Sequence, residues 1–174
     1  MRIGTIGALC ENKGQMKVIK SIAKLGRNAS ITYYCAGLPD KDYLNNLISN
    51  SQRLDVKFEY LGMLSPEKLR IFYNSLDLLI MPSSSEGFGL VAIESIACGT
   101  AVIVPSHLPI VHEVGLLNKN NSVIIKDNST DEICKGILKG KSINFKRNDV
   151  SKSINFITWK EIAFKYINLY NEIS

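Results

Sequence analysis

The stretch LLIMPSSSEGFGLVAIESIACGTAVIV, residues 78–104, decides the fold. It opens and closes with short continuous apolar runs, residues 78–81 and 101–104. Runs without polar alternation are typical of strands that are covered on both faces, as in a parallel sheet. Between them, residues 90–98 form an apolar segment of helical length, so the stretch predicts one strand–helix–strand unit of such a sheet.

The same alternation extends over the rest of the chain. We expect further strands at residues 2–9, 31–36, 56–61 and 122–125, and helices at residues 15–25, 43–54, 65–77, from about 130, and 158–173. Ser65 followed by Pro66 has the order of an N-cap and a first helical residue. Repeated right-handed strand–helix–strand units predict an α/β fold with a doubly wound, Rossmann-like parallel sheet of about six strands in one domain. Such sheets bind ligands beyond the carboxyl ends of their strands.

Three of the expected helices carry apolar residues at helical spacing, which indicates the faces that they turn to the core. These residues are Met16, Ile19, Ile22 and Ala23, then Leu44, Leu47 and Ile48, then Leu69, Phe72, Tyr73 and Leu76. The helix at 158–173 shows the same spacing. Residues 139–153 are polar and are expected to form a loop with room for a short helix.

The composition is that of a single globular domain, with 174 residues of which 45% are hydrophobic and 21% charged. No apolar run reaches the roughly 18 residues of a membrane-spanning helix, and residues 2–9 lack the flanks of a signal peptide. The four cysteines, Cys10, Cys35, Cys98 and Cys134, are scattered and show no metal-ligand spacing, which indicates a reducing compartment. We therefore expect a cytoplasmic protein.

The net charge of +5 suits an anionic ligand or an acidic lipid surface without specifying either. The densest basic stretch comprises Lys135, Lys139, Lys141, Lys146, Arg147 and Lys152. A solvated surface is favoured for this stretch, and a peripheral contact with the inner membrane stays open as the alternative. A nucleic-acid partner is not expected, because no aromatic residues interleave with these charges.

A glycine-rich loop leads from the apolar run at 78–81 into the helix at 90–98. It reads EGFG at residues 86–89, and glycines let a backbone approach a ligand closely. The unpaired amides of Gly89, Leu90 and Val91 would point at such a ligand from the helix N-terminus, an arrangement that suits phosphate. Taken alone, this loop fits phosphate binding and an ordinary α/β turn equally well.

Glu94 follows on a helix that is otherwise almost entirely apolar. It could be a solvent-facing carboxylate on a surface helix. We favour a functional role, because no polar stripe accompanies it and a carboxylate in apolar surroundings needs hydrogen-bond donors. The two hydroxyls of a ribose would supply them.

Glu86 and Glu94, with seven residues between them in EGFGLVAIE, resemble the paired-glutamate motif of retaining glycosyltransferases of family 4, which have the GT-B fold. The resemblance covers nearly all of the chain. It includes TIGALCENKG at 5–14, LG at 61–62, the helix at 65–77, ACGTAVIVP at 97–105, PIVHEVG at 109–115 and FITWKEIAFKYINLY at 156–170.

The resemblance implies a role for each candidate site residue. Glu86 would contact hydroxyls of the donor sugar, Glu94 would hold the ribose, and Lys13 would pair with the diphosphate. Without the resemblance, Lys13 could be an ordinary solvated loop lysine. The residues that would line the sugar, the phosphates and, for the last two, the base are Gly87, Phe88, Gly89, Leu90, Val91, Met63 and Leu64.

One departure from the family pattern is Ala8, which stands where an arginine usually precedes the lysine by five residues. A charge-assisted hydrogen bond contributes about 1.5–3 kcal/mol, so its loss puts turnover in more doubt than binding. The resemblance also implies that the chain begins at the first strand of the second GT-B domain. The N-terminal, acceptor-binding domain is therefore expected to be absent, and this chain alone is expected to be inactive.

The resemblance implies transfer of a hexose or N-acetylhexosamine from a nucleotide sugar, with retention and without a metal or other cofactor. We expect a UDP-sugar rather than a GDP-sugar, and a lipid-linked glycan or surface polysaccharide such as lipopolysaccharide as acceptor. The alternatives are a non-catalytic nucleotide-binding module, which Ala8 favours, and another GT-B enzyme such as a sugar-nucleotide epimerase. The spacing of Glu86 and Glu94 argues against the epimerase.

Overall fold

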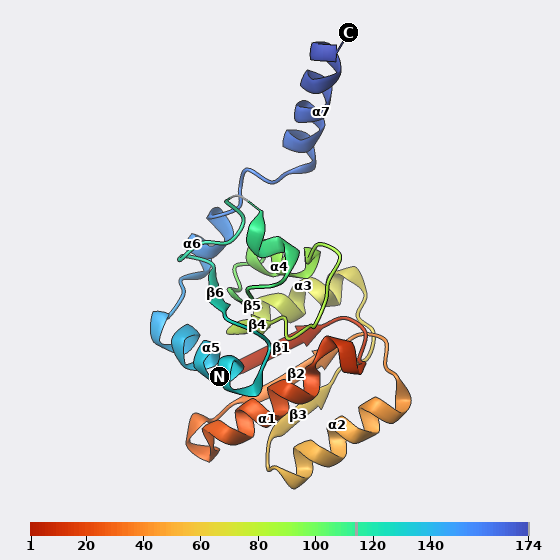
Figure 1. Cartoon of the computed structure of the whole chain (residues 1–174), viewed down its shortest axis with the longest axis vertical. Helices are drawn as coiled ribbons and strands as arrows, with labels where there is room; N and C mark the ends of the chain where they lie inside the picture. The colour runs from red at the N-terminus through yellow and green to blue at the C-terminus, as the bar shows by residue number, and fades with distance from the viewer. Residues whose placement is uncertain (114, 174) are drawn as a thin grey trace.

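The computed structural model describes residues 1–113 and 115–173, so that Val114 of the segment at 109–115 lies outside the described residues (Figure 1). Within them the chain forms a six-stranded sheet of order β3-β2-β1-β4-β5-β6 in which every pairing is parallel. The strands are β1 (Arg2–Ile6), β2 (Thr32–Ala36), β3 (Lys57–Tyr60), β4 (Leu78–Ile80), β5 (Val102–Pro105) and β6 (Ser122–Ile125). This is the doubly wound order in which the strand sequence reverses between β1 and β4. The predicted fold class is confirmed.

Helices cover both faces of the sheet. The elements on one face are α1 (Gln15–Leu25), α2 (Lys41–Arg53) and α5 (Thr130–Ile143), and those on the other are α3 (Pro66–Ser75), α4 (Leu90–Ala97) and α6 (Arg147–Lys152). Short 3-10 turns follow three of the elements: η1 (Glu11–Lys13), η2 (Arg27–Ala29) and η3 (Pro109–His112). The sheet is therefore the middle layer of three.

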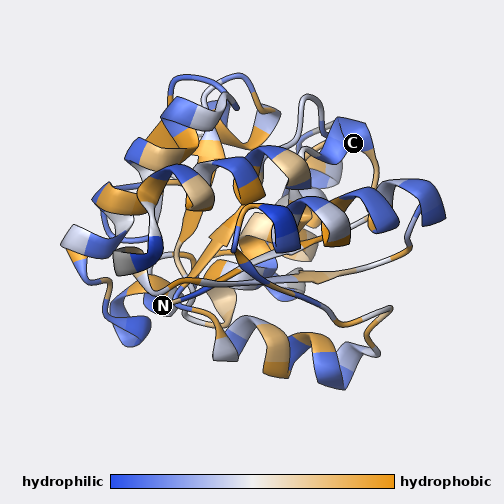
Figure 2. Ribbon diagram, turned by 90° about the horizontal axis from the view of Figure 1, so that it is seen from below, coloured by the Kyte–Doolittle hydropathy of each residue, from blue (hydrophilic) through white to orange (hydrophobic). Residues whose placement is uncertain are grey.

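The core lies along the central strands β4 and β5, whose residues are all buried. Figure 2 shows these hydrophobic strands between helices that turn their polar sides outward. The two apolar runs that predicted buried strands are confirmed, because α4 and α5 cover the sheet from both sides. Burying one Leu, Ile or Val side chain contributes roughly 1.5–3 kcal/mol, which makes this layer the main source of stability.

The boundaries of the elements agree closely with the prediction, with some corrections. The predicted N-cap is confirmed, because the Ser65 Oγ accepts a hydrogen bond from the Lys68 amide at the start of α3. The first strand ends at Ile6 rather than at residue 9. In α2, Ile48 is 37% exposed rather than turned inward, because this helix covers an outer part of the sheet and buries Leu47 instead.

The prediction of a loop with a short helix at residues 139–153 is confirmed for the short helix, α6 (Arg147–Lys152), and wrong for residues 139–143, which belong to α5. Helix α5 continues to Ile143, and α6 fills the rest with Val150 buried against the core. The Arg147 guanidinium donates to the Thr100 Oγ1 at 3.0 Å and to the Leu76 carbonyl oxygen, although the residue remains exposed. Arg147 therefore ties α6 to the end of α3 and to the turn before β5 while it stays at the surface.

The predicted C-terminal helix is present as α7 (Trp159–Ile173). Figure 1 shows it extending away from the body of the domain. Apolar side chains such as Phe164 and Ile167 are consequently exposed. None of the helices in the part of the chain that the structure describes combines the length and apolar character that crossing a bilayer would require.

Candidate functional site

Two loops at the carboxyl ends of β1 and β4 bring together Lys13 and Glu86. The Lys13 Nζ donates to both carboxylate oxygens of Glu86, at 2.8 Å to Oε1 and 2.7 Å to Oε2. The Ser83 hydroxyl adds a third hydrogen bond, at 2.6 Å to Oε1. The two charged side chains are only 25% and 19% exposed. A partly buried cation and anion thus lie at the edge of the sheet where doubly wound folds bind ligands.

The two loops are held to each other and to the loop before α5. The Asn12 carbonyl accepts from the Ser84 amide at 2.8 Å, and the Asn128 Nδ2 donates to the Pro82 carbonyl oxygen at 3.0 Å. Gly14 lies so close to that carbonyl that a Cβ at this position would collide with it. These contacts fix the position of Lys13 relative to Glu86. Sequence reasoning missed Asn12 and Asn128, since single asparagines in loops carry no pattern.

The N-terminus of α4 lies directly behind Glu86. Gly89 is its N-cap, and no side chain caps the helix. The first amides of a helix have no partner within it, so those at Gly89, Leu90 and Val91 are the ones available to an anion. Val91 lines a small hollow together with Lys13 and Glu86, which places these predicted residues side by side. Phe88 and Leu90 are exposed, at 37% and 62%.

Gln15 is a polar residue of this hollow that the sequence did not single out. Its Nε2 donates to the carbonyl oxygen of Ala8 at 2.9 Å. Its Oε1 is buried and has no hydrogen-bond partner among the described residues. The hollow encloses about 10 Å³, the space of roughly one water, so a larger ligand would lie over it rather than inside it.

Among the described residues, no second cation bonds Glu86 in place of the arginine that the family has where this chain has Ala8. Of the lysines and arginines that the structure describes, Lys13 is the one that bonds Glu86. Ala8 itself contributes only its carbonyl, to Gln15. The predicted departure from the family pattern therefore stands.

Glu94 does not join the ion pair. It lies on the exposed side of α4, and its Oε2 accepts a hydrogen bond of 2.8 Å from the hydroxyl of Tyr73 on α3. We expected apolar surroundings for Glu94, but its side chain is exposed, as in the alternative of a solvent-facing carboxylate, because α4 buries Ala92, Ser95 and Ile96 instead. Burial and the neighbouring Glu94 carboxylate raise the pKa of Tyr73 well above its ordinary value, so its hydroxyl stays a donor.

Met63 and Leu64 lie in the loop between β3 and α3. Met63 is 72% exposed. Leu64 lines an open groove of about 370 Å³ whose walls include Tyr34, Ile71 and Phe72. The groove is mostly apolar, which is compatible with a planar base, but it does not include the ion pair.

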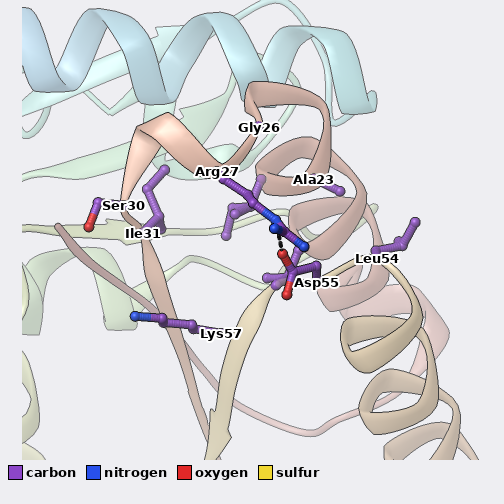
Figure 3. A pocket seen from close by; sticks show the side chains of 10 residues that line it. Ala23, Gly26, Arg27, Ser30, Ile31, Leu54, Asp55 and Lys57 are labelled. Atoms are coloured by element: carbon purple, nitrogen blue, oxygen red, sulfur yellow. Dashed lines mark ion pairs between the residues drawn. The ribbon is translucent and has the colours of Figure 1, made fainter.

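A larger cavity, of about 420 Å³, lies at the opposite, amino end of the strands (Figure 3). Residues at the end of α1, in η2 and around the start of β3 line this cavity. Arg27 and Asp55 form an ion pair across it, but these side chains are 85% and 62% exposed. None of the predicted site residues lines this cavity.

No group of three or more His, Cys, Asp or Glu side chains in residues 1–113 and 115–173 is arranged to hold a metal ion. The Nε2 of His107 lies 3.2 Å from the carbonyl oxygen of Ser83, the residue whose hydroxyl bonds Glu86.

Comparisons with known proteins identify the family and the fold of the chain. A family model described as "Glycosyl transferases group 1" matches residues 2–154. An uncharacterised glycosyltransferase of Methanocaldococcus jannaschii is 29% identical over 180 aligned residues, which cover 95% of this chain and 43% of that protein.

Solved structures share the fold. The sucrose-phosphate synthase of Thermosynechococcus elongatus superposes with a TM-score of 0.80 at 19% identity, over 99% of this chain and 45% of that one. Anabaena HepE, solved in complex with UDP-glucose, gives a TM-score of 0.73 at 20% identity, over 87% of this chain and 42% of that one. The chain thus spans less than half the length of each of these proteins, and it has the Rossmann-like architecture of one domain of GT-B glycosyltransferases.

Proposed function

The chain belongs to the glycosyl transferases group 1 family, and we propose that it is the donor-binding domain of a glycosyltransferase that moves a hexose or N-acetylhexosamine from a nucleoside-diphosphate sugar. The observation that carries the proposal is the Lys13–Glu86 pair beside the N-terminus of α4. It offers a cation and helix amides for a diphosphate, and a carboxylate for sugar hydroxyls. A nucleotide sugar joins these two chemistries in one molecule.

The proposal assigns the parts of the donor to separate groups. Lys13 and the amides of Leu90 and Val91 neutralise the diphosphate, whereas Glu86 accepts hydrogen bonds from the sugar. Glu94 accepts hydrogen bonds from the ribose, and the loop containing Met63 and Leu64 lies beside the base. We favour a UDP-sugar, in line with the UDP-glucose bound to Anabaena HepE.

The chemistry we propose is transfer with retention. The bond between the sugar C1 and the phosphate oxygen breaks while the acceptor oxygen bonds C1 on the same face, and the acceptor proton passes to the departing phosphate oxygen. Charge develops on that phosphate, where Lys13 and the α4 amides stabilise it. We therefore expect neither a metal ion nor another cofactor to take part.

The proposal specifies the acceptor only by its chemical class. We propose a lipid-linked glycan or surface polysaccharide, bound largely by a second domain, because the M. jannaschii relative is more than twice as long as the matched region. Nucleotide sugars place the reaction in the cytoplasm, with a peripheral contact at the membrane if the acceptor is a lipid. This domain by itself is expected to bind nucleotide and to transfer no sugar, because we propose that a second domain supplies the acceptor side of the cleft.

A non-catalytic nucleotide-binding module is the second candidate, and Ala8 favours it. One cation fewer at the diphosphate lowers stabilisation of the leaving group more than it lowers binding. The Ala8→Arg variant distinguishes a working enzyme from a non-catalytic module. An increase in transfer by the longer protein supports a working enzyme with a weakened site, and no transfer by either form supports the module.

The proposal is tested by titrating the chain calorimetrically with UDP and with UDP-glucose. Glu94→Ala should weaken both by a similar factor, about tenfold for 1.4 kcal/mol, because both carry the ribose. Glu86→Ala should weaken only UDP-glucose, since removing this carboxylate releases Lys13 for the diphosphate of free UDP. Glu172→Ala, on exposed α7, is the control and should change neither affinity.

The division of labour is wrong if Glu86→Ala weakens free UDP as much as Glu94→Ala does. The absence of any change in either variant would mean that neither glutamate contacts the nucleotide or its sugar.

A further inference from the structure

A buried phenol meets an exposed carboxylate where α3 and α4 lie together. Tyr73 is only 2% exposed, and its hydroxyl donates to the Glu94 Oε2 at 2.8 Å. Of the side chains that the structure describes, Tyr73 is the one that bonds this carboxylate. The second oxygen, Oε1, has no protein partner among them, so it is available to donors outside the chain.

Tyr73 is itself held in place by the core. Its carbonyl oxygen accepts from the Thr100 Oγ1 at 2.6 Å, and this hydroxyl in turn accepts from the Arg147 guanidinium at 3.0 Å. Its ring packs beside that of Phe72, with centroids 5.9 Å apart. Contacts from α3, from the turn before β5 and from α6 therefore fix the residue that carries the hydroxyl.

We propose that Tyr73 is a positioning residue for Glu94, whose hydroxyl holds the carboxylate in one orientation so that its free oxygen can accept from the vicinal hydroxyls of a ribose. This inference rests on the proposed function. It implies that a core residue helps the domain to distinguish nucleotides that carry ribose hydroxyls from nucleotides that lack them.

The physical basis is preorganisation. An exposed glutamate samples several rotamers, and a ligand that bonds it must order the side chain at a cost in affinity. The hydrogen bond from Tyr73 orders Glu94 before the ligand arrives. Its loss should weaken ribose-containing ligands about three- to tenfold and leave ligands without ribose hydroxyls unaffected.

The experiment compares UDP with 2′,3′-dideoxy-UDP, which lacks both hydroxyls but keeps the base and the diphosphate. Calorimetry on this chain gives the ratio of the two dissociation constants for the wild type, Tyr73→Phe, Glu94→Ala and the double variant. Tyr73→Phe keeps the buried ring, and thermal unfolding is used to check that the variant is folded. Tyr33→Phe is the matched control, since it removes another buried hydroxyl, which lies 2.9 Å from the Thr5 Oγ1 and remote from Glu94.

We expect Tyr73→Phe to weaken UDP about three- to tenfold, to leave dideoxy-UDP unchanged, and to add nothing to the effect of Glu94→Ala. Tyr33→Phe should leave the ratio as in the wild type. If Glu94→Ala selectively weakens UDP but Tyr73→Phe changes both ligands equally or neither, the positioning role is wrong and the proposed function stands. If Glu94→Ala fails to discriminate between the ligands, the ribose role falls and the positioning role falls with it.

A measurement on the wild type keeps the inference testable if Tyr73→Phe does not fold. Carbon-13 relaxation of the Glu94 methylene groups in the ligand-free chain should report a single ordered rotamer. Rotamer averaging as free as that of Glu172 on α7 would overturn the proposal.

Discussion

Two ion pairs lie at opposite ends of the parallel strands, and their surroundings differ. At the carboxyl end, Lys13 and Glu86 are mostly buried, and Glu86 accepts a third hydrogen bond from the Ser83 hydroxyl. At the amino end, Arg27 and Asp55 are mostly exposed and border the larger cavity (Figure 3). An exposed pair contributes about 0–1 kcal/mol, whereas partly buried charges carry a desolvation cost that the fold must offset.

The comparison shows that cavity size and the ordering of charged groups do not go together in this domain. The amino-end cavity is roomy, yet its charged groups are solvated and only local turns hold them. The carboxyl end has almost no free volume, but loops from β1, β4 and β6 are bonded together there around two sheltered charges. We interpret that arrangement as a preformed edge of a ligand site, which the following variants test.

The largest expected difference is in nucleotide affinity. Lys13→Met should weaken UDP about ten- to hundredfold, because one charge-assisted hydrogen bond to a phosphate contributes about 1.5–3 kcal/mol. Arg27→Met removes a cation from the matching pair at the other end and should leave the affinity within twofold. Calorimetric titration of both variants checks this. Equal losses in the two variants would mean that UDP responds to net charge and not to a site.

A smaller difference in UDP affinity is expected between the alanine variants of two glycines that have positive φ. Gly14 (φ 71°) touches the Pro82 carbonyl, whereas Gly26 (φ 76°) has open space around the position of a Cβ. Alanine at either position is strained by roughly 1–3 kcal/mol, so both variants should show a lowered melting temperature. Only Gly14→Ala should also weaken UDP, by about tenfold, because it pushes apart the loops that carry Lys13 and Glu86. A normal UDP affinity in Gly14→Ala would show that the spacing of the loops is unimportant.

The smallest expected effect is a loss of folding stability at alkaline pH, which involves Cys35 in β2. Burial raises the pKa of the Cys35 thiol to about 12 in the folded chain. The neutral thiol therefore contributes stability that is fully present below about pH 9 and is lost as pH rises from there toward 12, at most about 1.4 kcal/mol per pH unit.

Urea unfolding at pH 8 and pH 10 should accordingly show a smaller loss of stability in Cys35→Ala than in the wild type. Cys10→Ala, at a partly exposed cysteine, serves as the control. An identical loss in Cys35→Ala and the wild type would contradict the assignment.

The fold was predictable from the sequence because its signals are local. The apolar runs of β4 and β5 and the cap of Ser65 are each contained in a few consecutive residues. The error at residues 139–143 arose where tertiary contacts prevail over local composition. Gly140 lies against the Leu78 side chain in the tight packing of α5 on the sheet, and composition alone could not show this.

The site was predictable only in part, for the same reason. The roles assigned to Lys13, Glu86 and Glu94 require all three to lie beside one donor; Lys13 and Glu86 form an ion pair, whereas Glu94 bonds Tyr73 instead. The link between Tyr73 and Glu94 joins residues 21 positions apart on different helices, and no spacing rule predicts it. The same helix packing exposes Glu94, which the apolar character of its own helix had suggested was buried.

The central claim is that the carboxyl-end loops hold the nucleotide diphosphate, and amide chemical-shift mapping tests it most directly. The chain, labelled with nitrogen-15, is titrated with UDP. We predict saturable shifts at Lys13, Gly89 and Leu90, and none at Gly26 or Asp55 beside the amino-end cavity. Shifts concentrated at Gly26 and Asp55, or no saturable shifts at all, would contradict the account.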